Sequence, residues 1–165
     1  MKTNAARILD KLNVSYELLE YDVDPHDLDA ENTAKKLGLD AKQVFKTLVA
    51  KGDRHGVCFA VIPANTHLNL KQLARLSGDR KVNVVLLKDV QPLTGYIRGG
   101  VTVLGSKKSF PAYVDATIQR FEKIAVSAGM RGRMLFLTPA AYIDAIQGTL
   151  GAIAEPKPDD PLSEH

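Results

Sequence analysis

The apolar run from Val44 to Ala50 constrains the fold most, because it is rich in strand-forming residues and carries a single charge, Lys46, near its middle. In a strand, side chains alternate between two faces, so Lys46 would share a face with Leu48. An ammonium group is rarely buried without a partner, since removing its water is costly. Lys46 is therefore either a snorkelling residue at a sheet edge or a cation held at the wall of a pocket.

A hairpin is predicted around this run, because a second strand pattern, Val57–Ile62, follows Gln43–Ala50 after the turn Lys-Gly-Asp-Arg-His-Gly. Further strand patterns lie at 14–21, 82–86, 101–104, 112–115, 124–127 and 134–137, and helix patterns at 4–12, 32–37, 70–76, 89–93 and 139–146. The strands come in clusters and not in regular β-α-β alternation. This order predicts an α+β fold with a mixed, largely antiparallel and barrel-like sheet.

Length and charge suggest one domain with an acidic tail. A chain of 165 residues with 45% hydrophobic residues suits a single core. We expect one domain over residues 1–152 and a disordered, Pro-rich tail over 153–165. The tail carries four acids against one lysine, a balance of −3, so the rest carries +3 − (−3) = +6. A modestly basic body is compatible with RNA or phosphate partners, and a solvated surface explains the charge equally well.

The sequence argues against a membrane location and against several kinds of catalytic and metal site. No run of about 18 apolar residues exists and the N-terminus has no uncharged signal segment, so we expect a cytoplasmic protein with neither membrane nor DNA as a partner. Cys58 is the single cysteine, and the four histidines lack metal-ligand spacing, so we expect no metal and no cofactor. The segment Gly100–Lys107 fails the P-loop pattern, and no Gly-x-Ser-x-Gly elbow occurs.

Two glycine-containing turns remain as candidates for ligand contact. The first is Gly95–Gly100, in which paired glycines let backbone N–H groups approach a ligand or form a sheet bend. The second is Ser127–Gly132, which combines small residues with a cation and could be an anion-holding nest or an ordinary hairpin loop. With Lys46 they describe a site that holds a substrate and has no nucleophile of its own.

These segments resemble the YbaK/EbsC family of bacterial aminoacyl-tRNA deacylases, relatives of the editing domain of prolyl-tRNA synthetase. The similarity covers about residues 3–152, and its motifs keep the family's order and spacing. The matching motifs are Lys35-Lys-Leu-Gly-Leu39, Val44-Phe-Lys-Thr-Leu48, Leu68-Asn-Leu-Lys71, Thr94-Gly-Tyr-Ile-Arg-Gly-Gly100, Leu104-Gly-Ser-Lys-Lys108 and Val126-Ser-Ala-Gly-Met-Arg-Gly132. The family fold implied is a mixed, partly closed barrel with helices around it.

The resemblance implies an enzyme that hydrolyses the ester of a mischarged tRNA, best known for Cys-tRNA(Pro). Lys46 would then be the family's catalytic lysine, held near the ester or near the terminal ribose and phosphate, and Gly100 would supply backbone contacts at the ester. The implied mechanism is substrate-assisted, with the cysteine thiol attacking its own ester carbonyl. The implied partners are mischarged tRNA(Pro) and, transiently, prolyl-tRNA synthetase. The substrate-binding residues would be Tyr21, Thr47, Gly99, Ser127 and Arg131.

The chain departs from the family pattern at three places that bear on substrate choice. Val103 stands where the family often has proline, Leu28–Ala30 where it often has an aromatic residue, and Met134 where some members have an acid. Hydrophobic contact selects small side chains weakly, by about 1–3 kcal/mol per methylene. A deacylase for another small amino acid, such as alanine on tRNA(Pro), and a non-catalytic module that binds tRNA, a nucleotide or the synthetase therefore remain as alternatives.

Overall fold

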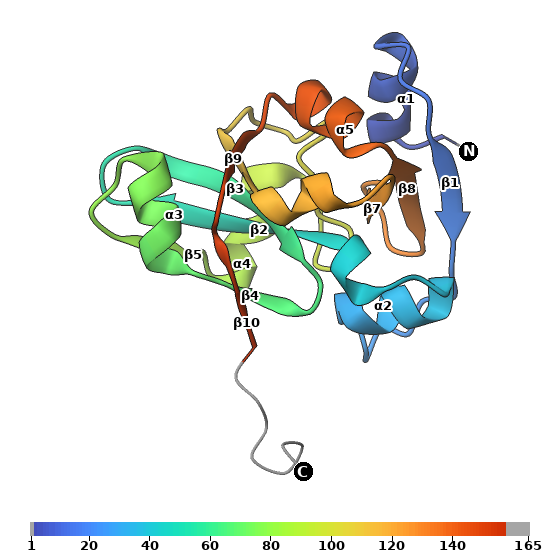
Figure 1. Ribbon diagram of the computed structural model, residues 1–165, viewed down its shortest axis with the longest axis horizontal. Coiled ribbons are helices and arrows are strands. Elements are labelled where there is room, and N and C mark those ends of the chain that lie inside the picture. Colours follow the sequence, from blue (N-terminus) through green and yellow to red (C-terminus); the bar gives the residue numbers. More distant parts are fainter. Residues whose placement is uncertain (1, 158–165) are drawn as a thin grey trace.

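The computed structural model describes residues 2–157 of the chain, and Figure 1 shows how its elements are arranged. The helices of this part are α1 (Asn4–Lys11), α2 (Ala30–Leu37), α3 (Leu70–Ser77), α4 (Leu87–Thr94) and α5 (Pro139–Ile146), with short 3-10 helices η1 (Ala41–Gln43) and η2 (Ala116–Arg120). The strands are β1 (Glu17–Glu20), β2 (Phe45–Gly52), β3 (Gly56–Pro63), β4 (Thr66–Leu68), β5 (Val82–Val84), β6 (Ala112–Asp115), β7 (Ile124–Ser127), β8 (Arg133–Leu137), β9 (Thr149–Gly151) and β10 (Ala154–Pro156).

Four of the five α-helices in the described part begin at polar side chains that accept backbone N–H groups, and α4, which follows Leu86, does not. The Thr3 side chain caps α1 by accepting from Ala6 N, and Thr138 caps α5, whose first residue is a proline. The α2 helix begins two residues before the predicted start at position 32. The cause is Asp29, whose Oδ1 accepts the N–H of Glu31 at 3.2 Å and so provides an earlier cap.

The strands form three sheets. A five-stranded sheet has the order β5-β2-β3-β6-β9, a three-stranded sheet the order β1-β8-β7, and β10 pairs with β4. Of the seven strand pairs in the described part of the chain, five are antiparallel, and β3–β6 and β6–β9 are parallel. The predicted α+β class with a mixed, largely antiparallel sheet is confirmed. The pairing within residues 2–157 closes no barrel, so the barrel-like closure is not confirmed.

One bridge and one core join the two larger sheets. Val44, just before β2, forms a parallel bridge with Ala125 of β7. Behind this bridge, Phe45 of β2, Val114 of β6 and Leu135 of β8 are buried in a single hydrophobic cluster, which α1 and α5 also cover. Burial of apolar surface is the main favourable term in folding, so this shared core fixes the two sheets relative to each other.

The predicted strand at Val101–Leu104 does not form. Its backbone instead turns, and Ser106 N donates to Val103 O at 3.4 Å. The Leu104 carbonyl accepts from the Tyr96 hydroxyl at 2.6 Å. The apolar side chains that suggested a strand pack from a loop, because Val101 and Val103 both contact the cluster around Phe59.

The end of the described chain is ordered beyond the predicted domain boundary at 152. Ile153 is fully buried, and β10 pairs with β4 at the lower side of the view in Figure 1. The buried carboxylate of Asp115 anchors this segment, because its Oδ1 accepts Ile153 N at 3.0 Å and Ala154 N at 2.9 Å. The predicted tail is therefore wrong for residues 153–157, and its remainder, 158–165, lies outside the described residues.

We predict that Asp115→Asn lowers the free energy of unfolding by roughly 2–3 kcal/mol, because an amide NH2 would face backbone donors in a buried site. Urea unfolding followed by circular dichroism measures the change. Asp40→Asn is the matched control: the exposed Asp40 caps η1 by accepting Lys42 N, and asparagine caps equally well. Equal stability of the two variants would show that the Asp115 network does not hold the chain end.

Candidate active site

A cavity of about 470 Å3 lies along one edge of β2, between the two larger sheets. The three-stranded sheet and its loops provide one wall, and β5 with α4 provides the opposite, apolar wall. The lining residues are Tyr21, Leu28–Ala30, Thr33, Val44–Val49, Val84, Val85, Leu87, Val90, Arg98, Gly99, Val101, Ser127 and Met134.

The cavity exists because β2 lacks a full-length neighbour on that side. Along its other side β2 pairs with β3 over its whole length, from Phe45 to Gly52. On the cavity side it pairs with β5 only from Ala50 to Gly52, and the bridge at Val44 lies before the strand begins. Residues 46–49 of β2, between these two contacts, therefore have no strand beside them on the cavity side. Their side chains alternate between the two faces of β2, and those on both faces reach the cavity.

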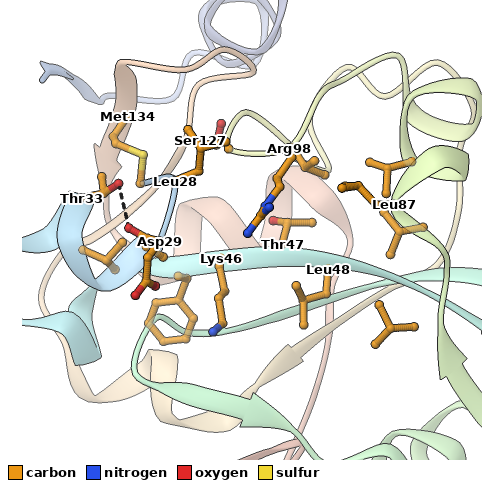
Figure 2. A pocket seen from close by; sticks show the side chains of 18 of the residues that line it. Leu28, Asp29, Thr33, Lys46, Thr47, Leu48, Leu87, Arg98, Ser127 and Met134 are labelled. Atoms are coloured by element: carbon orange, nitrogen blue, oxygen red, sulfur yellow. Dashed lines mark hydrogen bonds between the residues drawn. The ribbon is translucent and has the colours of Figure 1, made fainter. Parts of the chain in front are cut away.

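Lys46 lies in this open stretch and is half-buried. Its Nζ donates to the carbonyl oxygen of Ala64 at 3.2 Å. Figure 2 shows its side chain pointing to the side of β2 opposite Thr47, as alternation requires. Burial is the main cause that lowers the pKa of Lys46 below its ordinary value, and the nearby Lys157 ammonium lowers it further. Asp29 and Glu31 act in the opposite sense and favour the charged form.

The segment after β10 supplies a second cation near Lys46. Lys157 follows β10 directly and forms an ion pair with Glu31 of α2. Both side chains are about one-third exposed, at 32% and 35%. The pairing of β10 with β4 thus brings a residue more than one hundred positions away in sequence to the vicinity of the cavity, and the sequence offered no sign of this contact.

The two predicted glycine turns pack against each other. A Cβ added at Gly100 would lie 3.0 Å from two backbone atoms of Met130, which leaves no room for a side chain. The Nε of Arg131 donates to the carbonyl oxygen of Arg98 at 2.8 Å, so the second turn also holds the first by a hydrogen bond. Close approach between two backbones, in addition to any ligand contact, thus accounts for glycine at position 100.

Sequence reasoning missed Arg98 as a site residue. It lies in the first glycine turn and lines the cavity, and Figure 2 shows its guanidinium extending toward Thr47 on β2. The signal available in the sequence was a cation directly before paired glycines. Arg131, which was predicted instead, faces a neighbouring surface hollow with Gly132 and Arg133.

The structure brings together five of the seven predicted site residues. Tyr21, Lys46, Thr47, Gly99 and Ser127 all line the cavity. Ser127 is oriented locally, because its Oγ accepts the N–H of Gly129 at 3.1 Å. Gly100 and Arg131 do not line the cavity and act behind it, on the loop that carries Arg98. The catalytic and binding roles themselves stay predictions.

The cavity has hydroxyl groups and cations but neither cysteine nor histidine among its lining residues. Cys58 is buried in β3, and burial raises the pKa of its thiol to about 11, so it is protonated at neutral pH. Within residues 2–157, no three His, Cys, Asp or Glu side chains lie close enough to hold a metal ion. A substrate entering this cavity meets positioned charges and apolar walls.

Comparison with known proteins identifies the family. The model of the aminoacyl-tRNA editing domain matches residues 24–145. The chain belongs to this family. It is 42% identical over 152 residues to a protein of Enterococcus faecalis named "Putative Cys-tRNA(Pro)/Cys-tRNA(Cys) deacylase EbsC", covering 92% of this chain and 93% of that one. These matches confirm the resemblance drawn from the motifs, and the chain is an aminoacyl-tRNA deacylase, an ester hydrolase.

Two further similarities are informative. The "Multifunctional Ser/Thr-tRNA deacylase ProXp-y" of Escherichia coli K12 is 29% identical over 112 residues, covering 66% of this chain and 67% of that protein. A crystal structure described as "a putative trans-editing enzyme for prolyl tRNA synthetase" superimposes with a TM-score of 0.77 at 21% identity, covering 94% of this chain and 99% of that one. At this identity the superposition shows the fold alone.

In the described part of the chain, none of the helices is both long and apolar enough to span a bilayer.

We predict that the Lys46 ammonium titrates below the ordinary lysine value of 10.5 and that Lys157→Met raises its pKa. The increase follows because the substitution removes a nearby positive charge and frees Glu31 from its partner. Nitrogen-detected NMR of the lysine side chains, assigned with Lys46→Arg, measures both values. Lys11→Met, on the exposed last turn of α1, should leave Lys46 unchanged. A lower pKa of Lys46 in Lys157→Met than in the wild type would contradict this arrangement of charges.

We predict that Gly100→Ala destabilises the fold by about 1–3 kcal/mol, because the new methyl group would overpack the Met130 backbone. Chemical denaturation provides the measurement. An unchanged unfolding midpoint would mean that the two glycine turns are not in tight contact, and would return Gly100 to a role in ligand contact alone.

Proposed function

We propose that this deacylase removes cysteine from mischarged tRNA(Pro), by a route in which the substrate thiol is the nucleophile. The observation that carries the proposal is a cavity with cations and hydroxyls but no cysteine or histidine, in a chain 42% identical to EbsC over nearly its whole length. A site of this composition suits a substrate that brings its own nucleophile.

In the proposed reaction the cysteinyl sulfur attacks the ester carbonyl, a C–S bond forms, and the C–O bond to the terminal ribose breaks. The proton that the thiol loses passes to the ribose oxygen, and the tRNA leaves with a free terminal hydroxyl. Water then opens the resulting thiolactone to cysteine. Holding the thiol against the ester carbonyl lowers the activation barrier, because a well-oriented pair reacts with a high effective molarity. This effect is worth roughly 7–11 kcal/mol in well-oriented systems. Lys46 supplies positive charge near the developing oxyanion, where one donor is worth about 3 kcal/mol.

A second candidate is a deacylase for another small amino acid, such as alanine or serine. The similarity to the Ser/Thr-tRNA deacylase ProXp-y favours it, since that name refers to substrates without a thiol. The apolar wall from β5 and α4 accepts a small side chain of any kind, so the pocket walls alone do not select cysteine. Attack by the substrate thiol is what would distinguish cysteine from these other amino acids.

Prolyl-tRNA synthetase is the proposed transient partner. The body of this small domain is only modestly basic, which provides limited means to distinguish one tRNA from another. Release of mischarged tRNA by the synthetase directly to this enzyme would supply that selectivity.

We predict that Lys46→Ala slows release of labelled cysteine from Cys-tRNA(Pro) by roughly a hundredfold in kcat. Lys51→Ala is the matched control, because Lys51 is an exposed lysine on the same strand outside the cavity. A rise in KM at constant kcat would instead assign Lys46 to the terminal ribose and phosphate.

Seryl- and alanyl-tRNA(Pro) test the thiol in the same assay. Cleavage of all three esters at similar rates would contradict thiol attack and favour the second candidate. Preserved cysteine release in Lys46→Ala would remove Lys46 from the mechanism.

A further inference from the structure

The cavity has an uneven distribution of charge, of which the proposed reaction uses only Lys46. Among its described lining residues are two cations, Lys46 and Arg98, and a single acid, Asp29. Asp29 is exposed, lines the cavity and lies on the side opposite the turn that carries Arg98 (Figure 2). Capping α2 accounts for a polar side chain here, but serine or asparagine would cap as well, so the cap does not account for the negative charge. Of the groups of an aminoacyl-tRNA, the phosphates would be repelled by this charge, whereas the ester and the ribose are uncharged.

Local hydrogen bonds hold Asp29 firmly. Its backbone carbonyl accepts the N–H of Thr33 at 3.1 Å and is 3.4 Å from the Thr33 hydroxyl, as the first turn of α2 requires. Its Oδ1 accepts the N–H of Glu31. The start of a helix carries partial positive charge, which attracts a carboxylate placed there. Asp29 is therefore a positioned anion and not a freely rotating surface acid.

One carboxylate oxygen is left for a ligand. Within residues 2–157, no hydrogen bond or ion pair is formed by Asp29 Oδ2, since Glu31 N–H occupies Oδ1 and the nearby Lys46 donates to Ala64 instead. The neighbouring acid, Glu31, is already paired with Lys157 and does not line the cavity. Asp29 is thus the acid of this region that faces the cavity with free acceptor capacity.

We propose that Asp29 binds the α-ammonium group of the aminoacyl ester and so restricts the enzyme to substrates with a free α-amine. This inference rests on the proposed function for the identity of the ester. The substrate has one cationic group, the α-ammonium, and Asp29 is the single acid among the described lining residues that could attract it. Asp29 attracts it, leaving the cationic side of the cavity for the carbonyl oxygen and the terminal phosphate. Esters whose amine is acylated, as in peptidyl-tRNA, would lose this contact and be cleaved poorly.

The test compares Cys-tRNA(Pro) with N-acetyl-Cys-tRNA(Pro), which keeps the thiol and removes the charge. We expect the wild type to prefer the free amine by roughly 5- to 20-fold in kcat/KM, the effect of one charge-assisted hydrogen bond at a partly exposed site. Asp29→Asn should reduce that preference to within about twofold. Asparagine caps a helix as well as aspartate, so α2 stays intact. Asp40→Asn, the same substitution at the cap of η1, should keep the full preference.

An Asp29→Asn variant that slows both esters equally would overturn the proposal and assign Asp29 to the support of Lys46. An unchanged preference would overturn it as well. If the wild type cleaves neither ester, the proposed function fails. In that case, calorimetry measures the affinity for amide-linked cysteinyl-adenosine and for its N-acetyl form. Tighter binding of the free amine that is lost in Asp29→Asn supports the proposal. The same preference retained in Asp29→Asn overturns it.

Discussion

The parallel bridge between Val44 and Ala125 is the contact on which the site depends. It joins the three-stranded sheet to the five-stranded sheet just before β2 begins, and the shared core around Phe45 and Leu135 holds the joint in place. Beyond the bridge the two sheets diverge. The stretch of β2 from Lys46 to Val49 is left between them with no full-length strand on that side, and the cavity occupies this gap. The site is therefore a consequence of how two sheets meet.

Charge is arranged around this gap by segments that are distant in sequence. β2 contributes Lys46, the first glycine turn contributes Arg98, and the cap of α2 contributes Asp29. The Arg98 loop is held from behind by Arg131 and by the close contact of Gly100 with Met130. Residues that do not line the cavity thus hold the turn that carries Arg98. Preorganised charges of this kind stabilise a reacting ester without needing to rearrange during the reaction.

Local physics made much of the fold predictable. Alternation and β-branched residues marked β2 and β3, and helical patterns marked the α-helices, because both signals depend on near neighbours in the chain. The failures have tertiary causes. Val101 and Val103 are apolar because they pack on the Phe59 cluster, which their sequence pattern does not distinguish from a strand. The sequence did not predict β10, because this strand is held by the Asp115 carboxylate and by pairing with β4.

By itself, the sequence determined the α+β class and, through its motifs, the membership in the editing-domain family. The resemblance carried by those motifs also named Tyr21, Lys46, Thr47, Gly99 and Ser127, which the structure places around one cavity. These follow from local propensity and from motif order, which a linear chain records directly. Only the tertiary structure decided that Arg98 lines the cavity while Arg131 stands behind it, and that Lys157 reaches Glu31. It also decided that Asp29 is the acid facing Lys46 and Arg98. The physical reason is that the interaction of charges depends on their separation in space, and pairing between distant strands sets that separation.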